Sequence, residues 1–235
     1  MVRVSVLMPV YRTNEEYLRE AISSILAQTY SDFEFLILDD CPEDDRELIV
    51  KSYKDRRIKY LRNETNMGIS ESRNKLVDMA RGEYLAVMDH DDVSLPERLE
   101  KQVDYLDAHP DVGVVGCWTD VFPDNKGLYF PSDDFKIKSL MMNICAVVHP
   151  SSMLRKSVLI ENKIRYEKEY SPAEDYKLWC SLMEFTRFYN ISEVLFRYRS
   201  HDHRTSVLQK KTMREVTEEI HAIMRNKYPA FFAYY

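Results

Sequence analysis

Three carboxylates lie within four residues of one another at the end of an apolar run. Asp89, Asp91 and Asp92 follow residues 84–88, whose sequence is YLAVM. Carboxylates at such spacing repel one another, and a bound divalent cation is the usual remedy. An apolar strand that ends in a turn with exposed oxygens is typical of the ligand-binding edge of an α/β sheet. The cluster therefore predicts a site for a metal ion and a ligand that carries a diphosphate.

Two other interpretations of this acidic cluster compete with a metal–diphosphate site. Glu100 is the twelfth residue counted from Asp89, as in a calcium-binding EF-hand loop. However, Ser94 stands where such a loop needs glycine, and Pro96 would start a helix inside it. The EF-hand is therefore disfavoured, and an acidic turn that holds no metal is the remaining alternative.

The composition limits the classes of function. The chain has 235 residues and a formal net charge of −6, with acidic and basic residues interspersed, which predicts no broad basic surface and no nucleic-acid partner. The four cysteines are scattered, which favours a reducing compartment and free thiols. The five glycines form neither a G-x-G-x-x-G motif nor a P-loop. No apolar run approaches the ~18 residues that a membrane span needs, and Met1 leads directly into a strand-like segment, so we expect a cytoplasmic protein.

Hydrophobic periodicity predicts how these residues are positioned. In the first half, strands are expected at 3–8, 33–38, 58–61 and 84–88, and helices over about 15–26 and 44–54, from 70 and from 96. Asn14 is the expected N-cap of the first helix. This alternation predicts an α/β fold, a Rossmann-like, mostly parallel sheet with helices on both faces.

The pattern changes after about residue 112. Short strands are expected at 112–118, 188–191 and 194–199, with helices over about 135–142 and 172–185. These elements predict a mixed-sheet second half that completes a cleft over the first half. A charged helix is expected over 209–226. The chain then ends on four aromatic residues, which leads us to expect that the parent protein continues beyond Tyr235 and that this tail docks on a membrane or on a further domain.

Ten short segments of the chain form a specific pattern through their order and spacing. They are VSVLMPVY (4–11), AISSILAQTY (21–30), FEFLILDD (33–40), NMG (66–68), SRN (72–74), RGEY (81–84), MDHDD (88–92), HPSSMLR (149–155), AEDYKLW (173–179) and YRSH (198–201). This pattern resembles that of family 2 glycosyltransferases, which are inverting enzymes with a GT-A fold. The resemblance is dense over residues 3–110 and looser to about 206. It implies a GT-A domain over 1–207, with a nucleotide-sugar-binding half (1–110), an acceptor-side half (111–207) and a helical tail (208–235).

The resemblance also implies a donor site. The segment of Pro9, Val10 and Tyr11 would cradle the nucleotide base, and Asp40 would accept a hydrogen bond from a uracil-type ring N–H. The alternative is that Asp40 caps the following turn and Tyr11 is ordinary packing. Arg73, near the start of a helix, would meet the diphosphate or the base, unless it is a solvated surface arginine. The donor site would also include two further residues of the matching motifs, Asn66 and His90.

By the same resemblance, Asp91 would coordinate Mn²⁺ or Mg²⁺ bridging the diphosphate. Asp89 would reach the ribose or the same cation, and His201 would contact the donor phosphates or the metal. Hard divalent ions suit oxygen ligands and neutralise the charge that develops on a departing nucleoside diphosphate.

Asp175 matches the general base of the family. Ser171, Pro172 and Glu174 fit a capping box, which would leave Asp175 free to point toward an acceptor; the alternative is that Asp175 only complements the helix dipole. Trp179 would stack under a sugar ring or belong to the core. His149 is expected to line the acceptor side.

Together these features predict a metal-dependent inverting glycosyltransferase. The donor would be a nucleoside-diphosphate sugar, with UDP favoured, and the acceptor a hydroxyl of a saccharide or lipid-linked saccharide in cell-surface polysaccharide synthesis. A sugar-nucleotide nucleotidyltransferase normally opens with a glycine-rich basic loop, which is absent here. A non-catalytic saccharide-binding subunit is disfavoured by the intact acids, and a zinc hydrolase built on His149, His201 and His203 by the lack of tight ligand spacing.

Overall fold

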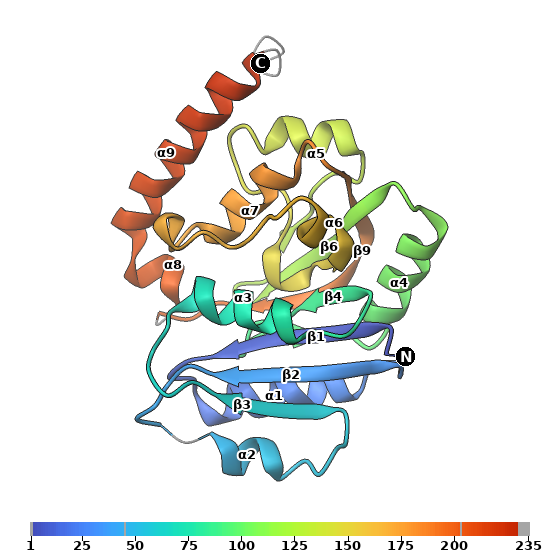
Figure 1. Cartoon of the computed structure of the whole chain (residues 1–235), viewed down its shortest axis with the longest axis vertical. Coiled ribbons are helices and arrows are strands. Elements are labelled where there is room, and N and C mark those ends of the chain that lie inside the picture. The colour runs from blue at the N-terminus through green and yellow to red at the C-terminus, as the bar shows by residue number, and fades with distance from the viewer. Residues whose placement is uncertain (1, 45, 203, 230–235) are drawn as a thin grey trace.

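The computed structural model describes residues 2–44, 46–202 and 204–229, and its centre is one nine-stranded sheet (Figure 1). Four strands of the first half run parallel in the order β3-β2-β1-β4. Their bounds are β1 Val4–Val10, β2 Phe33–Asp39, β3 Ile58–Arg62 and β4 Tyr84–Val87. The expected parallel first half is therefore confirmed.

The sheet continues without a break into the second half of the chain. The order beyond β4 is β8-β6-β9-β5, in which β8 is antiparallel to both neighbours and β6 is parallel to β9. This is the expected mixed half. The bounds are β5 Val93–Ser94, β6 Val112–Phe122, β7 Lys126–Leu128, β8 Met153–Arg155 and β9 Arg187–Arg199, with β7 paired to β6.

Helices cover both faces of the sheet, α1 lying behind it and α3 in front of it in Figure 1. Side chains of α1, α2 and α4 join one core cluster, and side chains of α3, α5, α6, α7 and α9 join the other. Every residue of β1 and β2 is buried because both faces are covered. The helices are α1 Glu15–Leu26, α2 Glu47–Lys51, α3 Ile69–Met79, α4 Arg98–Ala108, α5 Asp134–Leu140, α6 Lys156–Glu161, α7 Glu174–Leu182, α8 Thr205–Leu208 and α9 Lys210–Lys227, with 3₁₀ turns at His149–Ser151 and Lys168–Tyr170.

Three expectations about the elements are wrong. The two strands expected at 188–191 and 194–199 are the single strand β9, in which extra residues bulge out of the pairing with β6. The helix expected over 44–54 is shorter, at Glu47–Lys51. The expected capping box does not form, because α7 begins at Glu174 after Ala173 and has no side-chain cap. Asn14, by contrast, caps α1 as expected, with its side chain accepting from the backbone N–H groups of Glu16 and Tyr17.

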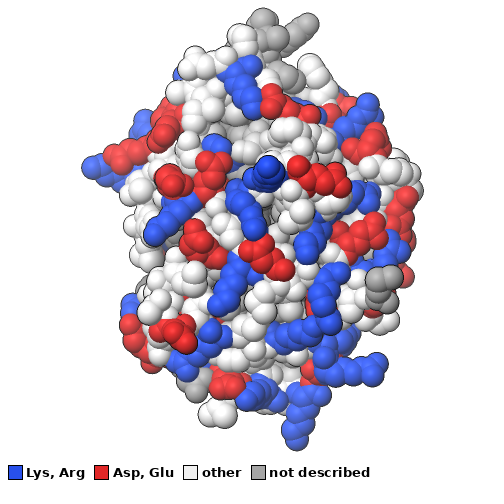
Figure 2. Space-filling model, viewed as in Figure 1, with Lys and Arg blue, Asp and Glu red and all other residues white. Residues whose placement is uncertain are grey.

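Acidic and basic side chains are mixed over most of the face seen in Figure 2, with Lys and Arg more frequent at its lower right. Among the described residues, none of the helices combines the length and the apolar character that crossing a bilayer requires.

Candidate active site

The three acids lie in the turn between β4 and β5, where strand β9 holds them. Because β5 pairs antiparallel with β9, the end of β9 lies beside this turn. The backbone N–H of Arg199 donates to Asp92 Oδ1 at 2.7 Å, and its Nε donates to the Asp91 carbonyl at 2.6 Å. The Arg199 guanidinium also forms an ion pair with Glu20 of α1 and stacks over the Tyr17 ring. Strand β9 therefore fixes the turn that contains Asp89, Asp91 and Asp92, which we call the acid turn.

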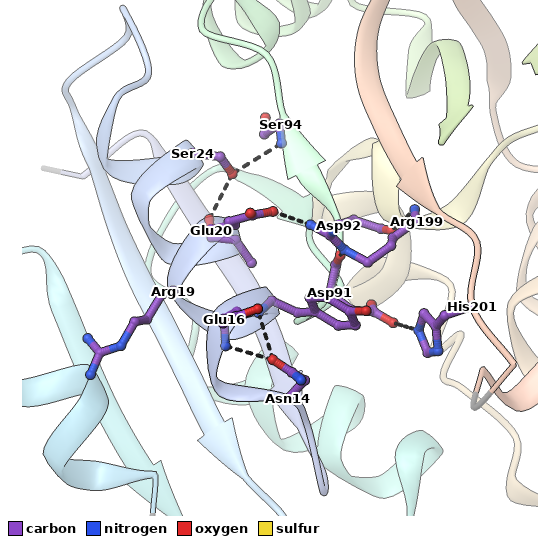
Figure 3. Close-up of polar contacts among 12 residues, drawn as sticks. Asn14, Glu16, Arg19, Glu20, Ser24, Asp91, Asp92, Ser94, Arg199 and His201 are labelled. Atoms are coloured by element: carbon purple, nitrogen blue, oxygen red, sulfur yellow. Dashed lines mark hydrogen bonds and ion pairs between the residues drawn. The ribbon is translucent and has the colours of Figure 1, made fainter. Parts of the chain in front are cut away.

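Asp91 and His201 point toward one another across this site (Figure 3). His201 Nε2 lies 2.8 Å from Asp91 Oδ2, and both side chains are only 18% exposed. Burial acts to raise the pKa of Asp91, but neighbouring His90 and His201 outweigh it and lower the pKa. The carboxylate is therefore held in its charged form, as a metal ligand must be.

The Asp91 and His201 pair fits a divalent cation in part. Their 2.8 Å separation is about that of two adjacent ligand atoms around an octahedral ion with bonds of about 2.1 Å. In addition, His90 Nδ1 is buried and has no hydrogen-bond partner among the described residues. Within those same residues, however, no three or more His, Cys, Asp or Glu side chains converge as a metal cage. Donor oxygens from a ligand would have to complete such a site.

Asp92 has a structural role that the sequence did not reveal. It is 1% exposed, and its Oδ1 accepts the Arg199 backbone N–H. Burial and the charges of Asp91 and Asp89 raise the pKa of Asp92 well above its ordinary value. The three acids thus differ in their partners. Asp92 is buried beside β9, Asp91 faces His201 and Asp89 faces Arg73.

Arg73 of α3 bridges two carboxylates from distant parts of the chain. Its Nη2 lies 3.2 Å from Asp89 Oδ1 and its Nη1 lies 2.6 Å from Glu174 Oε1 at the start of α7. Arg73 is 8% exposed, so the solvated-surface alternative is wrong. Burial acts to lower the pKa of Arg73, but Asp89 and Glu174 outweigh it and raise the pKa. Asp89 would contact a metal only by loosening this ion pair.

Asp175 follows Glu174 and has an unusual acidity. Burial and the adjacent Glu174 carboxylate raise its pKa to about 6, although Arg73 acts in the opposite direction. Its Oδ1 accepts the backbone N–H of Tyr176 at 2.7 Å. Since Glu174 pairs with Arg73, the side chain that the sequence assigned to helix capping instead links α7 to the acid turn.

The Asp40 carboxylate is hydrogen-bonded to the loop that follows β3. Its Oδ1 accepts from Asn63 Nδ2 and the Met67 N–H, and its Oδ2 accepts from the Gly68 N–H, each at 2.8 Å. Gly68 has φ of +84°, a backbone conformation that favours glycine. The turn-holding alternative therefore describes Asp40, and base recognition by this residue stays a prediction.

The other expected donor-side residues lie at the same edge of the sheet. Pro9 and Val10 are buried at the end of β1, and Tyr11 directly beyond is 41% exposed. Asn66 is exposed, and its side-chain amide lies 3.4 Å from the Asp40 carbonyl. Tyr11 and Asn66 are thus free to meet a ligand, while Pro9 and Val10 offer little beyond shape.

Two expected acceptor-side residues are internal. Trp179 is fully buried, so stacking under a sugar is wrong and the core alternative is confirmed. His149 is 3% exposed, and its Nε2 lies 2.9 Å from the Tyr166 hydroxyl, which belongs to the ring beneath Arg73. Burial, aided by Arg73, lowers the pKa of His149 well below its usual value. His203 lies outside the described residues. Sequence reasoning assigned no role to Tyr166 or Arg199, although Arg199 lies in the YRSH segment. Both residues reach the site only through contacts with segments that are distant in the sequence.

Comparisons with known proteins identify the family of this chain. The family model for Glycosyl transferase family 2 matches residues 5–162. A glycosyltransferase of Methanocaldococcus jannaschii is 38% identical over 206 residues, covering 83% of this chain and 70% of that protein. The O-antigen biosynthesis glycosyltransferase WbnJ of Escherichia coli is 35% identical over 212 residues, covering 86% and 81%. The chain belongs to glycosyltransferase family 2.

Solved structures confirm the fold of this family 2 glycosyltransferase. S. aureus TarS 1-349 in complex with UDP-GlcNAc matches with a TM-score of 0.79 and 21% identity, covering 95% of this chain and 67% of that one. The mannosyltransferase PcManGT of Pyrobaculum calidifontis, in complex with GDP-Man and Mn²⁺, matches with a TM-score of 0.67 and 16% identity, covering 96% and 64%. The expected GT-A-like α/β fold is therefore confirmed. That the protein is a transferase follows from the family model and from the glycosyltransferases to which it is similar.

Proposed function

We propose that this glycosyltransferase moves a sugar from UDP to a hydroxyl of a saccharide or lipid-linked saccharide, with inversion at the anomeric carbon. One observation supports the proposal: Arg73 pairs with Asp89 in the acid turn after β4 and with Glu174 at the start of α7. A charged Asp91 and a weakly acidic Asp175, which neighbour these two residues in the sequence, would then belong to one site. A UDP donor is supported by the fold shared with TarS, which is seen with UDP-GlcNAc.

Asp175 would act as the general base. It would take the proton of the acceptor hydroxyl as that oxygen attacks the anomeric carbon, while the bond from that carbon to the diphosphate oxygen breaks. A base works best when its pKa lies near the working pH, and the pKa of about 6 for Asp175 meets this requirement better than that of an ordinary aspartate. One displacement of this kind inverts the anomeric centre without a covalent sugar–enzyme intermediate.

Asp91 and His201 would hold the divalent cation. Asp89 would lie beside them, with its carboxylate paired to Arg73. When bound, Mn²⁺ or Mg²⁺ neutralises negative charge that develops on the departing diphosphate. A metal requirement is supported by PcManGT, whose structure contains Mn²⁺. The base and ribose would lie over Tyr11, Asn66 and the loop that Asp40 holds, near His90.

The class of acceptor and the pathway are proposed from a relative. The relative WbnJ acts in O-antigen biosynthesis. We therefore place this enzyme in the assembly of a cell-surface polysaccharide, in the cytoplasm or at the inner face of the membrane.

Binding of UDP measured by calorimetry with and without Mn²⁺ tests the proposal. Asp91→Asn should weaken Mn²⁺-dependent UDP binding at least tenfold, since it removes the charged ligand but keeps the size of the side chain. Asp104→Asn, an exposed acid on α4, is the matched control and should bind as the unchanged protein does. Binding that is indifferent to Mn²⁺ and to Asp91→Asn would refute the metal assignment, and GDP binding tighter than UDP binding would refute the choice of nucleotide.

A further inference from the structure

A groove of about 420 Å³ lies between the middle of β6 and the start of α5, apart from the acid turn. Its lining combines aromatic rings, small polar groups and two opposite charges, Asp133 and Lys136, so the lining carries no net charge. Trp118 is partly exposed and Tyr129 is 57% exposed. The residues that line it include Trp118, Tyr129, Phe130, Ser132, Asp133 and Ser192.

The bulge in β9 contributes a residue to this groove. Cys117 of β6 pairs with Ile191, but the next residue, Trp118, pairs with Val194. Ser192 is therefore left out of the ladder and is exposed at the groove. Bulges of this kind turn a side chain away from its regular position, and they are common next to binding sites.

The aromatic walls are held in place by the protein. The Trp118 indole N–H donates to the Phe130 carbonyl at 3.0 Å, and the Tyr129 hydroxyl donates to Asp120 at 2.9 Å. The two rings are 5.2 Å apart and inclined at 44°. The Tyr129 ring lies against Gly127, where a Cβ atom would come within 2.0 Å of it.

The loop that forms the third wall is also fixed. Asn190 is 1% exposed, and its side-chain amide donates to the carbonyls of Pro131 at 2.9 Å and Ala146 at 3.1 Å. A groove whose walls are already ordered loses little conformational entropy when a ligand binds.

We propose that this groove binds a sugar ring of a neutral oligosaccharide. The apolar face of a pyranose can lie on Trp118 or Tyr129, because aromatic rings offer a broad and rigid apolar surface. Its hydroxyl groups can bond to Ser132, Asp133 and Ser192, so the few polar groups would set the orientation of the ligand. A purely apolar partner would leave these three polar groups without water or a replacement.

The groove is placed to serve the transfer reaction, and this step rests on the proposed function. Trp118 and Phe122 belong to the same strand, and the Phe122 ring lies 4.5 Å from the Arg199 guanidinium that holds the acid turn. Four residues of strand span about 13 Å. A chain of several sugars bound at Trp118 would therefore reach the acid turn, and the groove would hold the part of the acceptor that lies behind the reacting sugar.

Tryptophan fluorescence gives a direct test because the chain has only two tryptophans and Trp179 is fully buried. Quenching by acrylamide should therefore report Trp118. The probes are linear tetrasaccharides of glucose, N-acetylglucosamine, mannose and galactose in α- and β-linked forms, with the monosaccharides as controls. At least one tetrasaccharide should lower the quenching constant twofold or more, with an affinity at least tenfold above that of its monosaccharide.

Variants at the exposed ring complete the test. Tyr129→Ala should weaken binding of the protective tetrasaccharide at least tenfold. Tyr129→Phe keeps the ring, so its affinity should stay within about threefold of that of the unchanged protein. Phe185→Ala removes an aromatic ring of similar exposure, 50%, outside the groove and should have no effect. Protection by none of the tetrasaccharides, or protection unchanged in a folded Tyr129→Ala protein, overturns the proposal. UDP binding by the same samples separates the two proposals, since protection without UDP binding refutes only the proposed function.

Discussion

Asp175 differs from the other acids of the site in how its charge is balanced. Burial and Glu174 raise its pKa to about 6, whereas Asp91 next to His90 and His201 has a lowered pKa. Transfer should therefore rise about tenfold per pH unit up to pH 6 and then level off, because only the deprotonated carboxylate can take a proton. Asp175→Asn should reduce transfer by a factor on the order of 10² or more without changing UDP binding. A rate that stays constant from pH 4.5 to 7 would point to another base.

The same raised pKa affects stability in a direction opposite to that of most aspartates. Because the folded protein favours the neutral form of Asp175, its contribution is present below the unfolded pKa of about 3.9 and is lost as the pH rises through about 6. Asp175→Asn should therefore raise the free energy of unfolding at pH 7.5 by on the order of 2 kcal/mol. The gain should vanish near pH 4. Urea unfolding at both pH values measures it, and an equal gain at both would mean that charge is not the cause.

At the scale of elements, Arg73 ties three segments together: α3, the turn after β4 and the start of α7. Removing one partner of a buried ion pair leaves its carboxylates uncompensated, so Arg73→Gln should cost about 3 kcal/mol of unfolding free energy. Adding Glu174→Gln should recover part of this loss, because one of the two stranded charges is removed. Arg12→Gln breaks an exposed pair with Glu43 and should leave the urea midpoint nearly unchanged, because water screens such a pair.

A double-mutant cycle by urea unfolding measures the coupling between Arg73 and Glu174. A coupling close to zero would show that the bridge between α3 and α7 contributes nothing. Loss of transfer in Arg73→Gln with normal Mn²⁺-dependent UDP binding would further assign the bridge to the acceptor side.

The elements also show what periodicity can and cannot reveal. The runs that became β1, β2 and α1 are long and strongly patterned, and Asn14 marks the start of α1, so local sequence suffices for them. Strand β8 has three residues, and it exists because β4 and β6 pair with it on both sides. Glu174 fits a capping box locally, but its partner Arg73 is 101 residues away in the sequence. Local patterns contain no information about such a pair.

The residues of the candidate site likewise divide into those that local sequence indicates and those that depend on pairing between distant segments. The position of Asp89, Asp91 and Asp92 in a turn was predictable because they follow a buried strand. Asp175 was assigned from the resemblance to the family, and its role stays a prediction. Arg199 was not predictable, since it reaches the acid turn only through the pairing of β5 with β9. Sequence reasoning also expected Val10 of β1 and Trp179 of α7 to lie beside a ligand. Both side chains are instead buried in the core.

At the scale of the whole molecule, both halves and the C-terminal helix share one core. A single buried cluster contains Leu7 and Leu36 of the first half, Trp179 of the second, and Ile220 and Met224 of α9. The boundary expected at 207/208 is therefore not a break in the core. Since the cluster is continuous, loosening α9 should lower the stability of the first half of the chain as well.

Ile220→Ala tests this coupling. Ile220 is fully buried, and truncating such a side chain costs about 3 kcal/mol, which in a protein of this size lowers Tm by about 6–12 °C. Glu219→Ala changes the adjacent exposed residue and should move Tm by no more than about 2 °C. If α9 were an independent tail, Ile220→Ala would leave the main transition where it was. If the core is shared, thermal unfolding followed by circular dichroism and by loss of UDP binding should shift together, because the helix and the donor edge of the sheet unfold as one unit.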